Sequence, residues 1–126
     1  MHVPEDLRYS EEHEWIRAKD GSTVRIGITD YAQDQLGDVV YVELPEVGDS
    51  VAKEDLVVEI ESTKSVGEVY APFAGEITAV NQTVAESPEL VNSSPYDEGW
   101  LVEIKVEGDL SWDGMLDAGA YKDLTE

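Results

Sequence analysis

The chain alternates apolar and polar residues over many short runs, and turn-forming residues separate one run from the next. The runs fall at residues 13–17, 23–28, 38–44, 56–61, 66–70, 76–80 and 100–106. Period-two alternation predicts strands with one buried face. In the fourth run the pattern assigns one face to Leu56, Val58 and Ile60 and the other to Val57, Glu59 and Glu61. Many short strands at close spacing predict a mainly β fold, a small sandwich or barrel.

Helices are predicted in two places. Thr29 or Asp30 can cap a short internal helix over residues 31–36, and Gly37 can end it. The tail near residues 109–124 is predicted to form C-terminal helices, two short ones, with Ser111 and Asp117 as candidate caps. A length of 126 residues is enough for a single domain, residues 1–126, and too short for two good cores.

An internal repeat relates residues 47–57 to residues 80–91. Both segments match V-x-x-[ST]-V-A, followed by L-V after one inserted residue in the second copy. Two similar halves related by a pseudo-twofold would place Lys64 in the connection between them. Chance similarity of short apolar patterns is the alternative interpretation.

The charge balance is extreme, with 29 acidic residues against eight Lys and Arg and a net charge of −21. Nucleic acid and anionic membranes would repel such a chain. No window approaches the roughly 18 apolar residues of a membrane span, and the N-terminal segment lacks the features of a signal or transit peptide. We therefore expect a soluble, cytoplasmic protein that binds neither nucleic acid nor membrane.

Most of the carboxylates must be hydrated, since at most eight can pair one-to-one with a base. At about 1 M salt the screening length is about 3 Å, against about 10 Å at 0.1 M. The composition therefore favours a very salty cytoplasm, that of an extreme halophile, and an acidic docking surface is the alternative.

Metal and thiol chemistry are not expected of the chain itself. Cysteine is absent, and the two histidines, His2 and His13, are far apart in sequence. We therefore expect no metal site, and any thiol chemistry must come from an attached group.

Lys64 lies between the runs at 56–61 and 66–70, at the tip of a predicted hairpin. A lysine in such a place is usually a solvated charge. A swinging-arm carrier, however, needs an amine that projects from a tight turn between rigid strands.

The segment around this lysine, E-S-T-K-S-V-G-E-V-Y-A-P-F-A-G-E-I, resembles the lipoyl-lysine segment of glycine cleavage system H proteins. The resemblance continues along nearly the whole chain, in Y-S-E-E-H-E-W-I-R, G-I-T-D-Y-A-Q-D-Q-L-G-D-V-V-Y-V-E-L-P, L-V-N-S-S-P-Y-D-E-G-W-L and L-D-A-G-A-Y. The middle segment alone would indicate only a lipoyl domain, whereas G-I-T-D and N-S-S-P-Y are more specific. We predict a loop at residues 92–95. The segment at residues 92–96 either fixes a loop near the arm or closes the sandwich.

The resemblance implies a lipoyl-domain-like barrel-sandwich, with a lipoyl hairpin near residues 56–80 and lipoate amide-linked to Lys64. It implies a monomeric carrier with no active site of its own. Glycine decarboxylase, a pyridoxal-phosphate enzyme, would transfer an aminomethyl group to the lipoyl arm. Aminomethyltransferase would pass the methylene to tetrahydrofolate, and dihydrolipoamide dehydrogenase would reoxidise the dithiol. A lipoate-attaching enzyme is a further expected partner.

A loaded arm carries a labile amine, so we expect it to fold back into a cleft with apolar walls and a carboxylate. Glu14, in the H-E-W segment, and Glu68, where H proteins usually have Asp, are the candidates, and Glu12 could join them. In so acidic a chain, surface charge is the alternative for each. Trp15 and Trp100 are expected to be core or sheet residues.

Several different classes of protein fit parts of the sequence. A biotinyl carrier typically flanks its lysine with methionines, where this chain has Thr63 and Ser65. The lipoyl domain of a 2-oxoacid dehydrogenase acyltransferase typically has Asp before the lysine and lacks the H-E-W and G-I-T-D segments. An H-like protein that relays lipoyl groups to different complexes is a closer rival, and an acidic interaction module without a cofactor is a more distant one.

Overall fold

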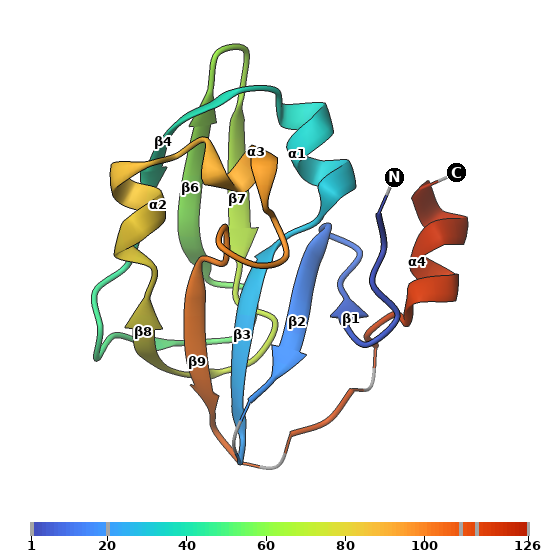
Figure 1. Cartoon of the computed structure of the whole chain (residues 1–126). Coiled ribbons are helices and arrows are strands. Elements are labelled where there is room, and N and C mark those ends of the chain that lie inside the picture. The colour runs from blue at the N-terminus through green and yellow to red at the C-terminus, as the bar shows by residue number, and fades with distance from the viewer. Residues whose placement is uncertain (1, 20, 109, 113, 126) are drawn as a thin grey trace.

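Two antiparallel sheets form the framework of the computed structural model, which describes residues 2–19, 21–108, 110–112 and 114–125 (Figure 1). The six-stranded sheet has the order β1 (Arg8–Tyr9), β2 (Glu14–Ala18), β3 (Thr23–Ile28), β9 (Val102–Val106), β8 (Gly75–Val80) and β5 (Ser50–Val51). The three-stranded sheet has the order β4 (Val39–Glu43), β6 (Leu56–Ser62) and β7 (Val66–Tyr70). The predicted mainly β fold is confirmed.

Helix α1 (Asp30–Leu36) confirms the predicted internal helix and decides between its two candidate caps. The Thr29 side chain accepts a hydrogen bond from the backbone N–H of Ala32 at 3.1 Å, so Thr29 is the N-cap. Gly37 ends the helix in a left-handed conformation, with φ of 86°, and its N–H donates to the Gln33 carbonyl. The side-chain cap and the glycine stop fix both ends of this short helix.

The predicted loop at residues 92–95 is wrong for its first half, because α3 (Leu90–Ser93) includes Asn92 and Ser93. The backbone N–H groups of both residues donate to the Glu89 carbonyl. Helix α2 (Gln82–Glu86), capped by Asn81, was also not predicted. Such short helices are marginal by themselves and depend on tertiary packing, which here buries Val84 and Val91.

The C-terminal tail forms one helix, α4 (Ala118–Thr125), within residues 110–112 and 114–125. Its Asp117 cap is confirmed, since Asp117 Oδ1 accepts a hydrogen bond from the Ala120 N–H at 2.8 Å. The helix predicted to start at Ser111 is wrong for the described residues, where Leu116 instead exchanges two backbone hydrogen bonds with Tyr9. Asp109, the predicted start of the tail, lies outside the described residues.

The two repeated segments have different local structures. Residues 47–57 contain turns, β5 and the start of β6, whereas residues 80–91 contain the end of β8, α2 and the start of α3. The repeat is therefore a similarity of sequence that is not matched in secondary structure. Lys64 lies in the turn between β6 and β7, two strands of the three-stranded sheet. Strand β8 pairs in the six-stranded sheet, so the hairpin around Lys64 consists of β6 and β7 alone.

The predicted alternation along β6 fails at its first two residues. Leu56 is 45% exposed and Val57 is buried, because the pairing of β6 with β7 shifts register between Leu56 and Val58. Such a bulge turns the strand and changes which face the preceding side chains occupy. From Val58 onward the alternation holds, with Val58 and Ile60 buried and Glu61 exposed.

The main core lies between the two sheets and contains Ile26, Ile77 and Ile104 from one sheet with Val58 and Ile60 from the other. A second apolar cluster lies where α4 and the N-terminal segment meet β2, and it includes Leu7, Tyr9, Trp15, Tyr96 and Tyr121. Strand β2 contributes to both, with Ile16 in the first and Trp15 in the second. Because β2 packs in both clusters, it connects α4, which packs in the second cluster, to the main core.

Trp15 is fully buried, and Gly27 is the cross-strand neighbour over which its ring lies. A Cβ added at Gly27 would come within 2.6 Å of the indole, so only glycine allows this packing. The indole N–H donates to the Pro95 carbonyl at 2.8 Å. Trp15 is thus a core residue, as expected from the sequence.

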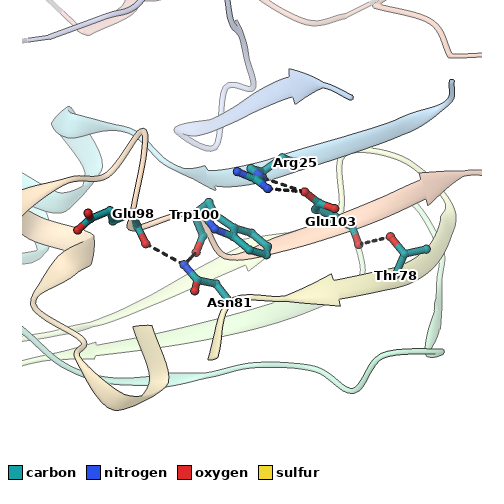
Figure 2. Close-up of polar contacts among 6 residues, drawn as sticks. All are labelled: Arg25, Thr78, Asn81, Glu98, Trp100 and Glu103. Carbon is teal, nitrogen blue, oxygen red and sulfur yellow. Dashed lines mark hydrogen bonds and ion pairs between the residues drawn. The ribbon is translucent and has the colours of Figure 1, made fainter. Parts of the chain in front are cut away.

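The described residues contain one ion pair, between Arg25 and Glu103 at 2.8 Å (Figure 2). The Arg25 guanidinium also lies 4.3 Å from the ring centre of Trp100, a favourable cation–π distance. Close by, the Asn81 side-chain amide donates to the carbonyls of Glu98 and Trp100 at 2.8 and 2.7 Å (Figure 2). These contacts link β3, β9 and the segment before α2.

On the three-stranded sheet, by contrast, three carboxylates oppose one another in one row. Glu59 on β6 pairs directly with Glu43 on β4 and with Glu68 on β7. Like charges directly opposite each other destabilise a sheet. Glu59 therefore experiences repulsion from both neighbouring strands, and screening by salt should relieve it.

We predict that stability rises with salt and that part of the rise comes from this row. The melting temperature should increase by roughly 5–10 °C from low to multimolar KCl, the shift that about 2 kcal/mol produces in a chain of this size. Glu59→Gln should gain about 0.5–1 kcal/mol at low salt and much less at high salt. The matched control is Glu107→Gln, at an exposed position outside the row. A melting temperature independent of KCl would contradict the prediction.

Candidate functional site

Lys64 is exposed at the tip of the β6–β7 hairpin, which projects beyond α1 (Figure 1). Ser62 closes the turn, because its N–H donates to the Ser65 carbonyl at 2.8 Å. The Ser62 hydroxyl accepts from the N–H groups of Lys64 and Ser65 at 3.3 and 3.0 Å. The lysine is therefore presented by a two-residue turn whose backbone is held by one serine.

A second set of contacts fixes the hairpin tip to the segment between α1 and β4. The Thr63 N–H donates to the Asp38 carbonyl at 3.0 Å. The Lys64 side chain lies over Gly37, where an added Cβ would be 3.0 Å from Lys64 Cε. Gly37 thus serves two purposes: it ends α1 and it leaves room for the lysine side chain.

Asn92 holds this same segment through both polar atoms of its side-chain amide. Its Oδ1 accepts from the Val39 N–H at 2.8 Å, and its Nδ2 donates to Gln33 Oε1 and to the Gly37 carbonyl, both at 2.9 Å. The N-S-S-P-Y segment therefore does fix a loop near Lys64. The sequence indicated the segment but not the role of Asn92, and no pattern pointed to Gln33 as its partner.

The same segment also contributes to the core. The Pro95 carbonyl accepts the Trp15 hydrogen bond, and the Tyr96 hydroxyl accepts from the Asp30 N–H at 3.0 Å while donating to the His2 carbonyl at 2.7 Å. These contacts place Tyr96 in the second apolar cluster, so they connect the segment to β2 and the N-terminal segment.

A cavity of about 380 Å³ lies beside the hairpin, between β7 and α1, and we call it the β7–α1 cavity. It is lined by Glu12, His13, Ile28, Tyr31, Ala32, Gln35, Leu36, Ile60, Ser65, Gly67, Glu68 and Val69. The apolar residues come from both sheets and from α1, and the two carboxylates stand among them. Apolar walls with a carboxylate are the features expected of a cleft for an amine-bearing arm.

A second cavity, also about 380 Å³, lies next to it, and we call it the Glu14 cavity. It is lined by Ser10, Glu11, Glu12, Glu14, Lys53, Glu54, Tyr70, Pro72, Gly114 and Met115. Of the predicted carboxylates, Glu68 lines the first cavity, Glu14 lines the second and Glu12 lines both. The structure thus brings the three into one region but divides them between two hollows.

Glu14 is only 2% exposed and is held by two donors. Its carboxylate accepts from the Ser10 hydroxyl at 3.0 Å and from the Tyr70 backbone N–H at 2.6 Å. Burial raises the pKa of Glu14 to about 7, and these hydrogen bonds offset part of that rise. Near neutral pH this side chain therefore exists in both protonation states.

Tyr70 connects the two predicted carboxylates, and it was not among the residues that the sequence indicated. Its backbone N–H donates to Glu14, while its hydroxyl donates to Glu68 Oε1 at 3.1 Å. The hydrogen bond to Glu68 is the main reason that the pKa of the Tyr70 hydroxyl is raised. No spacing in the sequence could have shown that one residue of β7 contacts both.

Exposed apolar side chains flank the lysine on the outer face of the three-stranded sheet. Tyr41 and Val66, 49% and 55% exposed, are the cross-strand neighbours of Glu61, close to the turn. Val40, at the bulge in β4, is 55% exposed. An enzyme that reaches Lys64 across this face would meet an apolar surface with a central carboxylate.

These features define the class of protein: an exposed lysine on a rigid hairpin of a two-sheet fold, with an acidic cleft beside it, is the arrangement of a lipoyl-type carrier. The family model described as glycine cleavage H-protein matches residues 7–126. The chain therefore belongs to the glycine cleavage H-protein family, whose members are lipoyl-bearing shuttle proteins and not catalysts.

The relatives agree along the full chain. The glycine cleavage system H protein of Listeria monocytogenes serotype 4a (strain HCC23) is 51% identical over 126 residues, which cover 100% of both chains. That of Anaeromyxobacter sp. (strain K) is 50% identical, over 100% of this chain and 98% of the relative. The crystal structure of a glycine cleavage system H protein from Mycobacterium marinum matches with a TM-score of 0.85 and 36% identity, over 96% of this chain and 97% of that one.

Among the described residues, no helix has the length and apolar character needed to cross a membrane.

The raised pKa of Glu14 predicts a specific pH dependence of stability. The carboxyl prefers its neutral form in the folded state but ionises near pH 4.5 when unfolded, so its stabilising contribution is complete below about 4.5 and is lost as pH rises to about 7. Glu14→Gln cannot ionise. Its stability relative to wild type should therefore increase from pH 4.5 to pH 7 by on the order of 3 kcal/mol.

Urea denaturation at several pH values and fixed high salt would measure this difference. Glu107→Gln, at an exposed carboxylate, is the control and should show no comparable change. A Glu14→Gln difference that stays constant over the same pH range would show that Glu14 titrates normally.

Proposed function

We propose that Lys64 is the residue to which lipoate is joined, through an amide at Nζ. The observation that carries this proposal is the position of Lys64 on the two-residue turn of a projecting hairpin. The remaining lysines lack that setting: Lys19 follows β2, Lys53 lies between strands of different sheets, Lys105 is within β9 and Lys122 is within α4. An attaching enzyme could therefore grasp Lys64 without unfolding the chain.

The residues around Lys64 fit a lipoyl group. When bound, the group supplies a dithiolane that accepts an aminomethyl group as its disulfide is reduced and that can afterwards be reoxidised. The chain itself supplies the attachment point, an apolar cavity for the hydrocarbon and carboxylates for the amine. Its lack of cysteine leaves no protein thiol to exchange with the dithiolane.

The proposed partners are those of the glycine cleavage system: glycine decarboxylase, aminomethyltransferase and dihydrolipoamide dehydrogenase, together with a lipoate-attaching enzyme. Each must receive the end of the arm, and the exposed hairpin leaves Lys64 free to enter their sites. We further propose that the chain acts as a single-domain monomer in a salt-rich cytoplasm, which its net charge of −21 and single described ion pair support.

The loaded arm, in this proposal, folds back over the β7–α1 cavity. Ile60, Leu36 and Val69 would cover its hydrocarbon. The amine would lie against the acidic edge shared by the two cavities, where Glu12, Glu14 and Glu68 lie. Tyr70 positions two of these carboxylates through its hydrogen bonds, so that they can receive a cation while water is limited.

Lys64→Arg tests the attachment. The change keeps the positive charge but removes the acylable amine, so we expect a folded protein with no lipoyl mass and no carrier activity. Intact-mass and peptide mass spectrometry of wild type and variant, expressed in cells with active lipoylation, would measure this. Lys53→Arg, in the loop between β5 and β6, is the control and should be modified fully. A lipoyl mass on the Lys64→Arg protein would refute the assignment.

Glu68→Gln and Glu14→Gln test the resting place. Each change removes a carboxylate that would hold the amine, so hydrolysis of the loaded arm should be faster, by roughly tenfold for a loss of about 1.4 kcal/mol. The lifetime would be followed at fixed high salt, with Glu107→Gln as the control. If Glu68→Gln and Glu14→Gln hold the loaded arm for as long as the wild type and the control do, these carboxylates do not hold the amine.

A further inference from the structure

A chain of hydrogen bonds joins the C-terminal helix to the wall of the β7–α1 cavity. The Tyr121 hydroxyl, on α4, lies 2.8 Å from His13 Nδ1 and 2.6 Å from the Thr29 hydroxyl. Thr29 in turn caps α1 by accepting from the Ala32 N–H. One hydroxyl therefore contacts two segments, the turn before β2 and the start of α1, and we call this arrangement the Tyr121 clamp.

The clamp is fully buried at Tyr121 and Thr29 and half-buried at His13, and it supports a strained backbone conformation. Tyr121 and Thr29 are both fully buried, so water cannot replace either partner. His13 has a φ of 67°, a conformation that costs a non-glycine residue free energy and persists only when its surroundings enforce it. The backbone also contributes, since the Thr29 N–H donates to the His13 carbonyl at 3.1 Å.

Both clamped segments form the wall of the cavity opposite β7. His13 lines it directly, and α1 supplies Tyr31, Ala32, Gln35 and Leu36. The His13 ring also lies against Tyr31, with ring centres 4.9 Å apart. Removal of the Tyr121 hydroxyl would therefore release the imidazole at the edge of the space in which the arm is proposed to rest.

The charge of His13 matters because the cavity is otherwise acidic. The titratable groups around the ring are Glu12 on its own turn, Tyr31 on α1, Tyr121 on α4 and Glu68 across the cavity on β7. Burial lowers the pKa of His13, and Glu12 opposes that shift. A neutral ring leaves both carboxylates to an incoming amine, whereas a released and protonated ring would pair with them.

We propose that Tyr121 is a positioning residue for the carrier arm, because its hydroxyl fixes the His13 ring and the start of α1. The fixed ring keeps the wall opposite Glu68 uncharged, and the carboxylates of Glu12 and Glu68 then stay available to the amine. The inference rests on the proposed resting place of the arm. It assigns a role in carrying the labile group to a helix that is remote from Lys64 in sequence.

Tyr121→Phe tests the proposal, with Tyr9→Phe as the matched control. Tyr9 is also fully buried, stacks on Tyr121 with ring centres 4.6 Å apart, and donates its hydroxyl to the Pro4 carbonyl. The control therefore loses a comparable hydrogen bond from the same aromatic cluster without touching the cavity. Two quantities would be measured in the full chain: the pKa of His13 by NMR titration without any arm, and the lifetime of the loaded arm.

We expect Tyr121→Phe to move the pKa of His13 up toward its ordinary value of 6.5. Below pH 6.5 the lifetime of the loaded arm should then be shorter by roughly threefold or more, because the protonated His13 ring competes with the amine for the carboxylates. Tyr9→Phe should change neither quantity. In case Tyr121→Phe does not fold, Thr29→Val removes the second partner of the clamp together with the side-chain cap of α1, whereas Thr29→Ser keeps both hydrogen bonds and should leave both quantities unchanged.

An unchanged His13 titration in the clamp variants would overturn the proposal, and so would equal lifetimes in Tyr121→Phe and Tyr9→Phe. The proposed function can fail separately. A wild-type lifetime no longer than that of free loaded lipoamide would mean that no cleft protects the arm, whatever the His13 titration shows.

Discussion

Burial of apolar side chains between the two sheets is the constraint on which the rest of the structure depends. An isolated two-stranded hairpin is marginally stable at best in water, so the β6–β7 hairpin is rigid because Val58, Ile60 and Val69 pack in the common core. The hairpin can then extend a two-residue turn into solvent without losing its geometry. Lys64 owes its fixed direction to the buried side chains of the two strands that flank it.

The hydrogen bonds around the tip add a second level of order. Asn92 holds the segment at residues 37–39, and that segment holds Thr63 through the Asp38 carbonyl. The Val39 N–H and the Gly37 carbonyl lie where a helix ends and a strand begins, and the asparagine amide supplies the partners that backbone groups need there. A short helix, a strand end and a turn are therefore joined as the support of the lysine.

Electrostatics acts in the opposite direction to this packing. The chain keeps Glu59 between two other glutamates and buries Glu14 in a site that raises its pKa, and both choices cost stability. Carboxylates that repel one another are, however, well suited to receive a cationic amine. In the proposed resting place of the arm, the carboxylates of Glu14 and Glu68 would therefore be unfavourable for folding and useful for carrying a charged group.

The sequence by itself determined the class of fold, most strands, helix α1 with its glycine stop, and the lysine at a hairpin tip, because these follow from local periodicity and turn chemistry. It did not determine the bulge that exposes Leu56, the two helices at residues 82–93, the separation of Glu14 from Glu68 into neighbouring cavities, or the contacts of Tyr70 and Asn92. Only the tertiary structure decided these, since each depends on groups that are distant in sequence and meet only when the two sheets pack.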